Sequence, residues 1–373
     1  MPLDPSQLDA KAEPLSQQRA DAASSNVRAR RADDPDVVAR IDALVADLAG
    51  AGPSNTFHEK MVREMVQTAL KLIPDGRDTG EIKLLSSAFK ELRYAYRVFG
   101  RYKKPHKVTI FGSARTPKEH PDYAAAVDFS KLMAEAGWMS ITGAGLGIME
   151  AGHVGPGRGG SFGVAIRLPF ETSFNPVIEG DEKLIEFRYF FTRKLMFVSQ
   201  AEAVALFPGG FGTMDEAFET LTLVQTGKST PMPIVLVEGK GHDYWENWLD
   251  WMKAQLLDRG WISPEDSSLI YLAKDAKDAA EHILRFYRVY HSSRYVRDEL
   301  VIRMNYSIGS EAVARLEQRF ATLIKSGGMR LSGPIEGEDD ALDKPRLIFK
   351  HTRSKYGMVR QLIDAINECP PSA

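Results

Sequence analysis

The chain begins with a stretch poor in large apolar residues and then changes to a helical pattern. Residues 1–35 consist mainly of Ala, Ser, Gln, Asp and Arg, a composition that predicts a disordered or loosely packed tail. Apolar residues then recur at helical spacing over 36–49, 55–73 and 80–99. We therefore expect residues 36–104 to form a helical N-terminal segment that packs on the main domain or on another subunit.

From Lys107 the pattern changes to short apolar runs that alternate with helical stretches. The predicted strands are Val108–Phe111, Trp138–Thr142, Phe162–Ile166, Ile185–Phe190, Ala203–Phe207 and Ile234–Val237, and the predicted helices are 121–136, 193–201, 213–226, 243–258 and 275–290. Alternating β and α units predict a parallel sheet with helices on both faces. Residues 105–292 are thus expected to form a doubly wound, Rossmann-like α/β domain that binds ligands beyond the carboxyl ends of its strands.

The last part of the chain has a different order of elements. Strands are predicted at 299–304, 328–333 and 346–350, and helices at 309–325 and 357–368. Residues 293–373 are therefore expected to form a small α+β appendage, with the acidic stretch Glu336–Asp343 as an exposed loop. The pattern leaves open whether this appendage is regulatory or serves packing and oligomerisation.

Composition narrows the class of protein. A net charge of -2 and a pI near 6.5 give no bulk argument for binding nucleic acid or an anionic membrane. The single cysteine, Cys369, excludes an internal disulfide and a multi-cysteine zinc site. There is no apolar run of about 20 residues, as a membrane span requires, and no secretory signal. We expect a cytoplasmic protein that binds neither nucleic acid nor membrane.

The stretch Pro208–Glu216 carries the strongest chemical signal. It joins a predicted buried strand to a predicted helix, where backbone N–H groups and the helix dipole together favour an anion. The predicted phosphate ligands here are Gly209, Gly210, Gly212 and Thr213. Thr213 and Glu216 also fit a T-x-x-E capping box, which needs no ligand. A cap does not require three glycines before it, and the two roles are compatible.

Two further glycine-rich loops follow predicted strands. In the loop after the first strand, Ser113 and Arg115 are candidate phosphate contacts. In the loop after the second, Gly143, Gly145 and Glu150 are candidate ligand contacts, although the spacing is GxGxG and not the GxGxxG of a dinucleotide fingerprint. Each loop taken alone is also compatible with an ordinary tight turn.

Arg193 and Lys194 stand at the start of a predicted helix. The helix dipole repels cations at that position, so two adjacent positive charges need an anion nearby or full solvation. A substrate phosphate could supply that anion.

Taken together, these motifs resemble the LOG family of cytokinin riboside 5′-monophosphate phosphoribohydrolases, long labelled as lysine decarboxylases. The resemblance rests on the complete PGGxGTxxE motif at 208–216, the Arg193-Lys194 pair and the glycine loop at 142–150, and it covers about residues 105–290. It implies a Rossmann-like domain, homo-oligomers, and hydrolysis of the N-glycosidic bond of nucleoside 5′-monophosphates. It also implies that Arg193 and Glu216 are catalytic.

The chain departs from the short members of that family in two ways. Short members have a glutamate directly before the Arg-Lys pair, where this chain has Thr192. Both terminal extensions are similar to those of the longer bacterial nucleotide 5′-monophosphate nucleosidases, which implies a broader purine or pyrimidine substrate. Glu216 would stabilise an oxocarbenium-like sugar and activate water, while Arg193 holds the phosphate or ribose. No cofactor and no metal are expected.

Two other functions stay open at this stage. Some relatives of the fold carry a nucleotide-like molecule, such as molybdenum cofactor, without turnover. A pyridoxal-phosphate decarboxylase would need a lysine for the Schiff base and a partner for the pyridine nitrogen, and no lysine in the sequence is singled out for that role.

Overall fold

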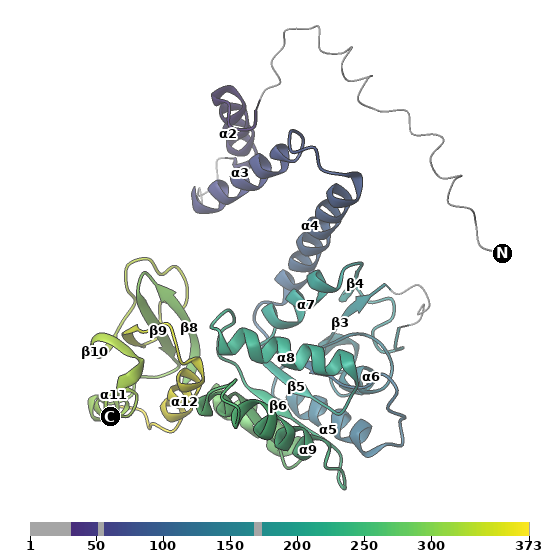
Figure 1. Cartoon of the computed structure of the whole chain (residues 1–373), viewed down its shortest axis with the longest axis vertical. Helices are drawn as coiled ribbons and strands as arrows, with labels where there is room; N and C mark the ends of the chain where they lie inside the picture. The colour runs from purple at the N-terminus through teal and green to yellow at the C-terminus, as the bar shows by residue number, and fades with distance from the viewer. Residues whose placement is uncertain (1–30, 51–55, 168–173, 373) are drawn as a thin grey trace, which may run out of the picture. The chain divides into compact units, whose positions relative to one another are not determined.

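The computed structural model describes residues 31–50, 56–167 and 174–372. The predicted tail therefore lies almost wholly outside the described residues. The chain divides into two compact units, residues 1–86 and 87–373, whose elements are labelled in Figure 1. The boundary falls inside a helix and not at the predicted boundary between residues 104 and 105.

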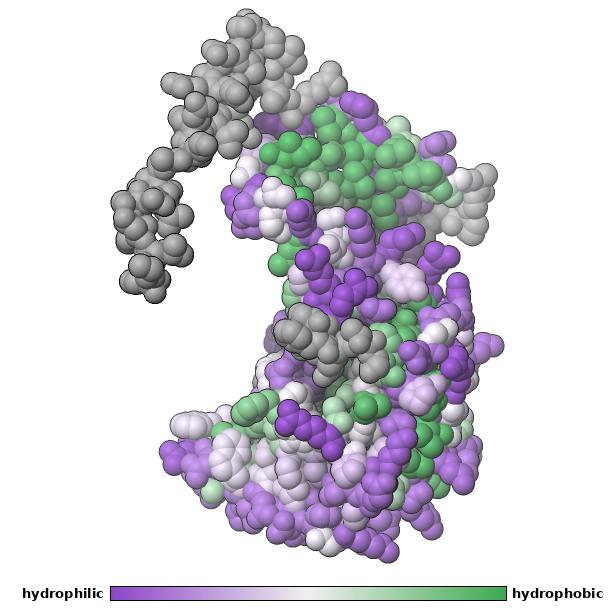
Figure 2. Space-filling model, turned by 90° about the vertical axis from the view of Figure 1, so that its right-hand side faces the viewer, coloured by the Kyte–Doolittle hydropathy of each residue, from purple (hydrophilic) through white to green (hydrophobic). Residues whose placement is uncertain are grey.

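The first unit is helical, as predicted. It contains α2 (Pro35–Ala49), α3 (Thr56–Lys71) and the start of α4 (Thr79–Phe99). An ion pair of 2.6 Å between Arg63 and Asp42 connects α3 to α2. Much of its apolar surface is exposed, and Figure 2 shows an apolar patch on this unit. The exposed apolar residues of the unit include Leu44, Leu48, Phe57, Met65 and Ile73.

The second unit contains the predicted parallel sheet. Its strands are β1 (Lys107–Phe111), β2 (Met139–Thr142), β3 (Ser161–Ile166), β4 (Leu184–Phe187), β5 (Ala203–Leu206), β6 (Ile234–Leu236) and β7 (Ile270–Leu272). They pair in the order β4-β3-β2-β1-β5-β6-β7, and every pairing is parallel. The Rossmann-like fold is thereby confirmed, with β7 as an additional edge strand.

Helices cover both faces of this sheet (Figure 1). The helices are α5 (Pro121–Glu135), α6 (Ile148–Val154), α7 (Phe190–Ser199), α8 (Phe211–Gln225), α9 (Tyr244–Met252) and α10 (Ala276–Phe286), with short 3₁₀ or π turns η3 (Gly100–Tyr102), η4 (Arg158–Gly160), η5 (Lys253–Leu257) and η6 (Pro264–Leu269). The end of α4 packs with α7, α8 and α9 in one core, while α5, α6 and α10 form the other. Fully buried strands of this kind need apolar residues on both faces, which explains their continuous apolar runs.

The strand order reverses direction between β1 and β5. The chain builds the sheet outward from β1 to β4 and then returns to place β5 against the other side of β1. The loops after these two strands therefore diverge and leave a crevice between them, which is the usual ligand site of open α/β sheets. Both loops carry motifs singled out in the sequence.

The C-terminal appendage is a four-stranded antiparallel sheet with two helices. Its elements are β8 (Tyr290–Val296), β9 (Glu299–Met304), α11 (Ser310–Arg319), η7 (Ala321–Leu323), β10 (Ile324–Ser332), β11 (Arg346–His351) and α12 (Tyr356–Asn367), with strand order β10-β11-β9-β8. The predicted α+β class is confirmed, but β8 was missed because the preceding helix ends at Phe286 and not at 290.

One prediction for the appendage, an exposed acidic loop, is confirmed for most of the residues 336–343 but not for Glu338. The stretch Glu336–Asp343 is not exposed throughout, because the side chain of Glu338 is fully buried. It accepts hydrogen bonds from Arg303 and Arg346 on the sheet. Elsewhere in the described part of the chain, no helix is both long and apolar enough to cross a bilayer.

Candidate active site

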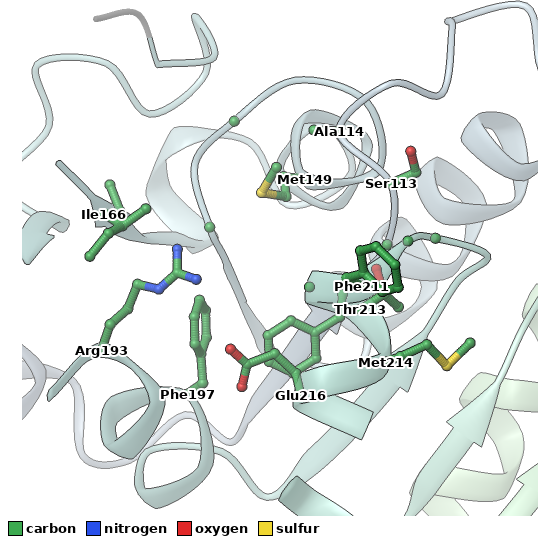
Figure 3. A pocket seen from close by; sticks show the side chains of 18 of the residues that line it. Ser113, Ala114, Met149, Ile166, Arg193, Phe197, Phe211, Thr213, Met214 and Glu216 are labelled. Atoms are coloured by element: carbon green, nitrogen blue, oxygen red, sulfur yellow. The ribbon is translucent and has the colours of Figure 1, made fainter. Parts of the chain in front are cut away.

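A pocket of about 790 Å³ opens beside the carboxyl ends of β1 and β5. The loops after β1, β2 and β5 form its wall together with residues of β3 and α7, as Figure 3 shows. Of the residues predicted for the site, all but Glu150 and Lys194 lie on this wall: Ser113, Arg115, Gly143, Gly145, Arg193, Gly209, Gly210, Gly212, Thr213 and Glu216. Motifs far apart in the sequence thus meet at one place.

The loop after β5 leads directly into the N-terminus of α8. Gly210 is the N-cap, and no side chain caps this helix. Thr213 is the third residue of α8 and Glu216 lies in its second turn, so the capping box considered from the sequence is wrong. The N–H groups of Phe211 and Gly212, the first two residues of α8, have no intrahelical acceptor. They therefore provide free donors for an anion on the pocket wall.

Two glycines allow the loops to approach each other closely. A Cβ on Gly209 would lie 2.1 Å from Thr213 Oγ1 and 3.0 Å from the backbone N of Ser113. That same N–H of Ser113 donates a hydrogen bond of 3.1 Å to the carbonyl of Pro208. Gly147 has φ +61°, and a Cβ there would lie 2.4 Å from the carbonyl oxygen of Ser113. Side chains at these glycines would force the loops apart and open the crevice.

Arg193 is a largely buried cation, and no carboxylate of the described residues accepts a hydrogen bond from its side chain. Its guanidinium carbon lies 5.0 Å from the ring centroid of Phe190 and 5.4 Å from that of Phe197, distances typical of cation–π contacts. Its Nε is buried and has no hydrogen-bond partner among the described residues. Burial lowers the pKa of Arg193 from its ordinary value, yet an arginine keeps its charge. Figure 3 shows the guanidinium directed into the pocket.

Glu216 faces the same pocket from α8 (Figure 3). The residue is 4% exposed, and its Oε2 has no hydrogen-bond partner among the described residues. Burial raises the pKa of Glu216 to about 7, although the nearby charges of Lys194 and Arg193 lower it. A carboxylate with such a pKa exchanges a proton readily at neutral pH, which suits a general base.

Lys194 has a different position from the predicted one. Its Nζ lies 2.6 Å from Glu219 Oε2 and 2.9 Å from Asp215 Oδ2, and 3.9 Å from Glu216 Oε2. The anion expected beside this lysine is thus supplied by the protein's own carboxylates. Burial lowers the pKa of Lys194, but the hydrogen bonds that it donates to Glu219 and Asp215 outweigh that effect and raise its pKa. Lys194 does not line the pocket, but its charge lowers the pKa of Glu216, which does.

Glu150 is also absent from the pocket wall. This residue of α6 is 4% exposed, and its Oε1 accepts a hydrogen bond of 2.7 Å from Lys118. The contact of Glu150 to ribose or base stays a prediction, and in the structure its carboxylate forms an ion pair with Lys118.

A carboxylate does lie beside Thr192, where short family members have a glutamate. It comes from α4, since Thr192 Oγ1 donates a hydrogen bond of 2.8 Å to Glu91 Oε2. The other oxygen of Glu91 accepts the N–H of Arg188 at 3.0 Å. A residue of the N-terminal extension therefore places a carboxylate at the start of α7.

The sequence reasoning missed the apolar part of the wall. It is formed by Phe111, Met149, Ile166, Phe174, Phe190 and Phe197. Phe190 and Phe197 stand three residues before and four after Arg193, so the helical spacing of α7 already placed them on the same face as the arginine. An aromatic and aliphatic wall, two of whose rings contact Arg193, is suited to a flat heterocycle.

Known proteins are similar to this chain mainly in the parallel-sheet region that carries the pocket. Residues 142–283 match the family model described as "Possible lysine decarboxylase". The cytokinin riboside 5′-monophosphate phosphoribohydrolase LOG7 of Arabidopsis thaliana is 32% identical over 122 residues, which are 32% of this chain and 54% of that protein. The cytokinin riboside 5′-monophosphate phosphoribohydrolase of Mycobacterium tuberculosis is 29% identical over 157 residues, covering 41% of this chain and 81% of the relative.

A solved structure is also similar in part. The molybdenum cofactor carrier protein of Chlamydomonas reinhardtii has 18% identity and a TM-score of 0.34, and the match covers 49% of this chain and 98% of that protein.

Proposed function

We propose that this chain, which matches the family model over residues 142–283 and is similar to two cytokinin riboside 5′-monophosphate phosphoribohydrolases, hydrolyses the N-glycosidic bond of a nucleoside 5′-monophosphate. The products are the free base and ribose 5-phosphate. The observation that carries the proposal is the buried pair of Arg193 and Glu216, each with a buried polar atom that no described residue satisfies, in a pocket beside a free helix N-terminus. Buried polar atoms without partners are rare in structural roles and common where a ligand completes them.

The phosphate lies, in this proposal, at the N-terminus of α8. The free N–H groups of Phe211 and Gly212 donate to it, and the helix dipole adds to the attraction. Arg115 and Ser113, on the loop after β1, stand on the same wall and supply further donors. The ribose then lies between this cradle and the Arg193–Glu216 pair.

The chemistry follows from the charge that develops on the sugar. As the C1′–N bond breaks, its electron pair leaves with the base and the ribose gains oxocarbenium character. The carboxylate of Glu216 stabilises that charge and takes a proton from the attacking water, whose oxygen bonds to C1′. The departing base takes up a proton, so the sum is the nucleotide plus water giving base and ribose 5-phosphate. Arg193 holds the phosphate or ribose hydroxyls in place.

The apolar wall accounts for the base. Aromatic rings such as Phe174 and Phe190 provide flat surfaces for stacking, and aliphatic Met149 and Ile166 complete that side. We assign to this subsite either a plain purine or pyrimidine or an N6-substituted adenine, the base of the substrate named for the two curated relatives.

A substrate panel tests the proposal directly. The purified chain is incubated with AMP, GMP, CMP, UMP and isopentenyladenosine 5′-monophosphate, and free base and ribose 5-phosphate are separated by chromatography. We expect at least one monophosphate to be cleaved, and the matching nucleoside, which lacks the phosphate, to lose about 100-fold in kcat/KM because charge-assisted hydrogen bonds of about 3 kcal/mol are missing.

Two variants make this experiment decisive. Glu216→Gln keeps the shape of the side chain and is expected to lower kcat by about 10²–10⁴-fold. Glu246→Gln, an exposed glutamate on α9, is the matched control and is expected to leave kcat unchanged. Release of base at the parent rate by Glu216→Gln would refute the role of that carboxylate. No release from any substrate, together with an intact nucleotide-like molecule bound to the purified protein, would replace hydrolysis by carriage.

A further inference from the structure

A second group of polar side chains lies near the carboxyl edge of the sheet, outside the wall of the active-site pocket. His120 is the N-cap of α5, Asp122 follows in the first turn, and His242 stands in the loop after β6. One ligand atom from each residue lies within 4.8 Å of the others. Two imidazoles and a carboxylate are a ligand set that divalent transition metals prefer.

Asp122 lacks an adequate positive partner. Its side chain is 6% exposed, and Oδ1 accepts a hydrogen bond of 2.6 Å from the N–H of Gly239. Among the described residues, no lysine or arginine lies within ion-pair distance of Asp122, and the nearest basic atom is Nδ1 of His120, 3.4 Å from Oδ2. A buried carboxylate is costly unless a cation or hydrogen bonds compensate its charge.

The imidazole of His120 does not provide that compensation without losing its cap. Its Nδ1 accepts the backbone N–H of Asp122 at 3.2 Å, which requires an unprotonated nitrogen. The same Nδ1 lies 3.4 Å from Asp122 Oδ2. A cation bound to both atoms would take the lone pair of Nδ1 from the helix N–H and would compensate the charge of the buried carboxylate.

His242 supplies a third ligand at a suitable place. Its ring stacks on that of His120, with centroids 5.0 Å apart and an angle of 24° between the planes. Zinc bonds to nitrogen and oxygen at about 2.0–2.2 Å, so the ligand atoms of a tetrahedral ion lie about 3.4 Å apart. His120 and Asp122 already have this spacing. His242 is exposed, and rotation of its side chain closes the remaining distance.

The loop that carries His242 is held firmly against α5. A Cβ on Gly239 would lie 2.4 Å from the carbonyl carbon of Pro121 and 2.6 Å from the N of Asp122, so only glycine allows this approach. Gly241, with φ +85°, then turns the chain back toward His242. The fold therefore brings the three ligands together from two segments far apart in the sequence.

We propose that His120, Asp122 and His242 bind one divalent transition metal ion of the Zn²⁺ class. Three protein ligands leave a fourth position for water or an external ligand. The ion ties the start of α5 to the loop after β6. Two residues beyond His242, the hydroxyl of Tyr244 donates a hydrogen bond to the carbonyl of Gly209. Metal binding therefore also restrains Tyr244, which supports the loop after β5 through this hydrogen bond.

The test measures metal binding and does not depend on turnover. The full chain, without a histidine tag, is treated with a chelator, dialysed and titrated with Zn²⁺ against a chromophoric competitor, and its metal content is measured by mass spectrometry. We expect one Zn²⁺ per chain, and a rise in Tm on adding the metal. His242→Ala should weaken binding by about 100-fold or more, since even loss of an outer-shell partner costs about 10–100-fold.

Because His242 is exposed, we expect His242→Ala to fold as the parent does. His106→Ala is the matched control, since it removes another exposed histidine outside the cluster. The control should bind Zn²⁺ as the parent does. The proposal is overturned if the parent binds less than one Zn²⁺ per chain in excess metal. It is also overturned if His242→Ala binds Zn²⁺ and gains in Tm as the parent does. Either result leaves the hydrolase proposal untouched.

Discussion

The protein buries charged side chains in two places, and it treats them in opposite ways. In the pocket, the Nε of Arg193 and the Oε2 of Glu216 are buried and lack hydrogen-bond partners among the described residues. In the C-terminal appendage, Glu338 is fully buried and accepts hydrogen bonds of 2.8 Å from Arg303 and 3.0 Å from Arg346. We call the pocket charges of Arg193 and Glu216 the open set, because these buried atoms lack partners. We call Glu338 with Arg303 and Arg346 the closed set, because its members bond to one another.

The same residue type shows the difference through its pKa. Burial raises the pKa of Glu216 to about 7, because the neighbouring cations do not compensate the lost hydration. Burial also acts to raise the pKa of Glu338, but hydrogen bonds from Arg346, the N–H of Ile335 and Arg303 hold it below its ordinary value. A buried glutamate is therefore no sign of function in itself. Whether its partners come from the protein decides the matter.

The largest expected effect on stability comes from breaking the closed set. Glu338→Gln leaves the buried guanidinium of Arg346 without its charge partner and that of Arg303 with Asp340 alone, and we expect a loss of about 3–5 kcal/mol in the free energy of unfolding. Urea denaturation measures it. Glu336→Gln is the matched control, because Glu336 is 87% exposed in its ion pair with Arg297 and should cost less than about 1 kcal/mol. Equal costs for the two variants would remove the contrast between a closed network and a surface pair.

The unpaired carboxylate of Glu216 should lower the stability of the fold when it is ionised, whereas the paired carboxylate of Glu338 stabilises it. The pKa of Glu216 is raised from 4.5 to about 7 by folding, so the folded state binds more protons than the unfolded state between these values. Stability then falls as the pH rises from 4.5 to 7 and stays lowered above 7. The full difference is about 3 kcal/mol at about 1.4 kcal/mol per pH unit.

Glu216→Gln removes this ionisation and should therefore gain stability over the parent as the pH rises. The free energies of unfolding of both proteins, measured at pH 5 and pH 8, give the comparison. We expect the variant to be more stable relative to the parent at pH 8 than at pH 5. A difference that is the same at both pH values would mean that Glu216 is not desolvated as described.

The sequence predicted the open site better than the closed one, for a physical reason. The glycine loops and the Arg193–Glu216 pair depend on local chemistry at strand ends, which a motif can show. The partners of Lys194 and Glu150 depend on tertiary packing, so the sequence did not show the ion pairs that both residues form. The burial of Glu338 and the meeting of His120 with His242 likewise come from pairing between distant segments.

The fold shows the same division. Strands β1, β2, β3, β5 and β6 are buried along almost their whole length and were predicted, because burial on both faces leaves a strong pattern. β7 has only three half-buried residues, Ile270–Leu272, and was missed. β8 was missed because only every third of its residues Tyr290–Val296 is buried, so the alternation typical of a strand is absent, and because it follows a helix closely. Weak burial gives a weak pattern.

The smallest expected effect concerns Lys194, which forms ion pairs within the protein and also lies near the unpaired carboxylate of Glu216. Lys194 is paired with Asp215 and Glu219, as in a closed network, but it also lowers the pKa of Glu216. Lys194→Met removes that cation and leaves the neighbouring carboxylates, which raise the pKa of Glu216. If ionised Glu216 is needed for turnover, the acidic limb of the kcat/KM profile should lie near pH 7 in the parent.

The limb should move upward by about one pH unit in Lys194→Met, equivalent to about 1.4 kcal/mol. Lys228→Met, an exposed lysine just beyond α8, is the control and should leave the limb in place. A limb that stays near pH 7 in Lys194→Met would mean that Lys194 belongs to a structural network alone. A limb that moves would show that the ion pairs of Lys194 help to set the protonation of Glu216. The paired charges around Lys194 and the unpaired carboxylate in the pocket would then act together.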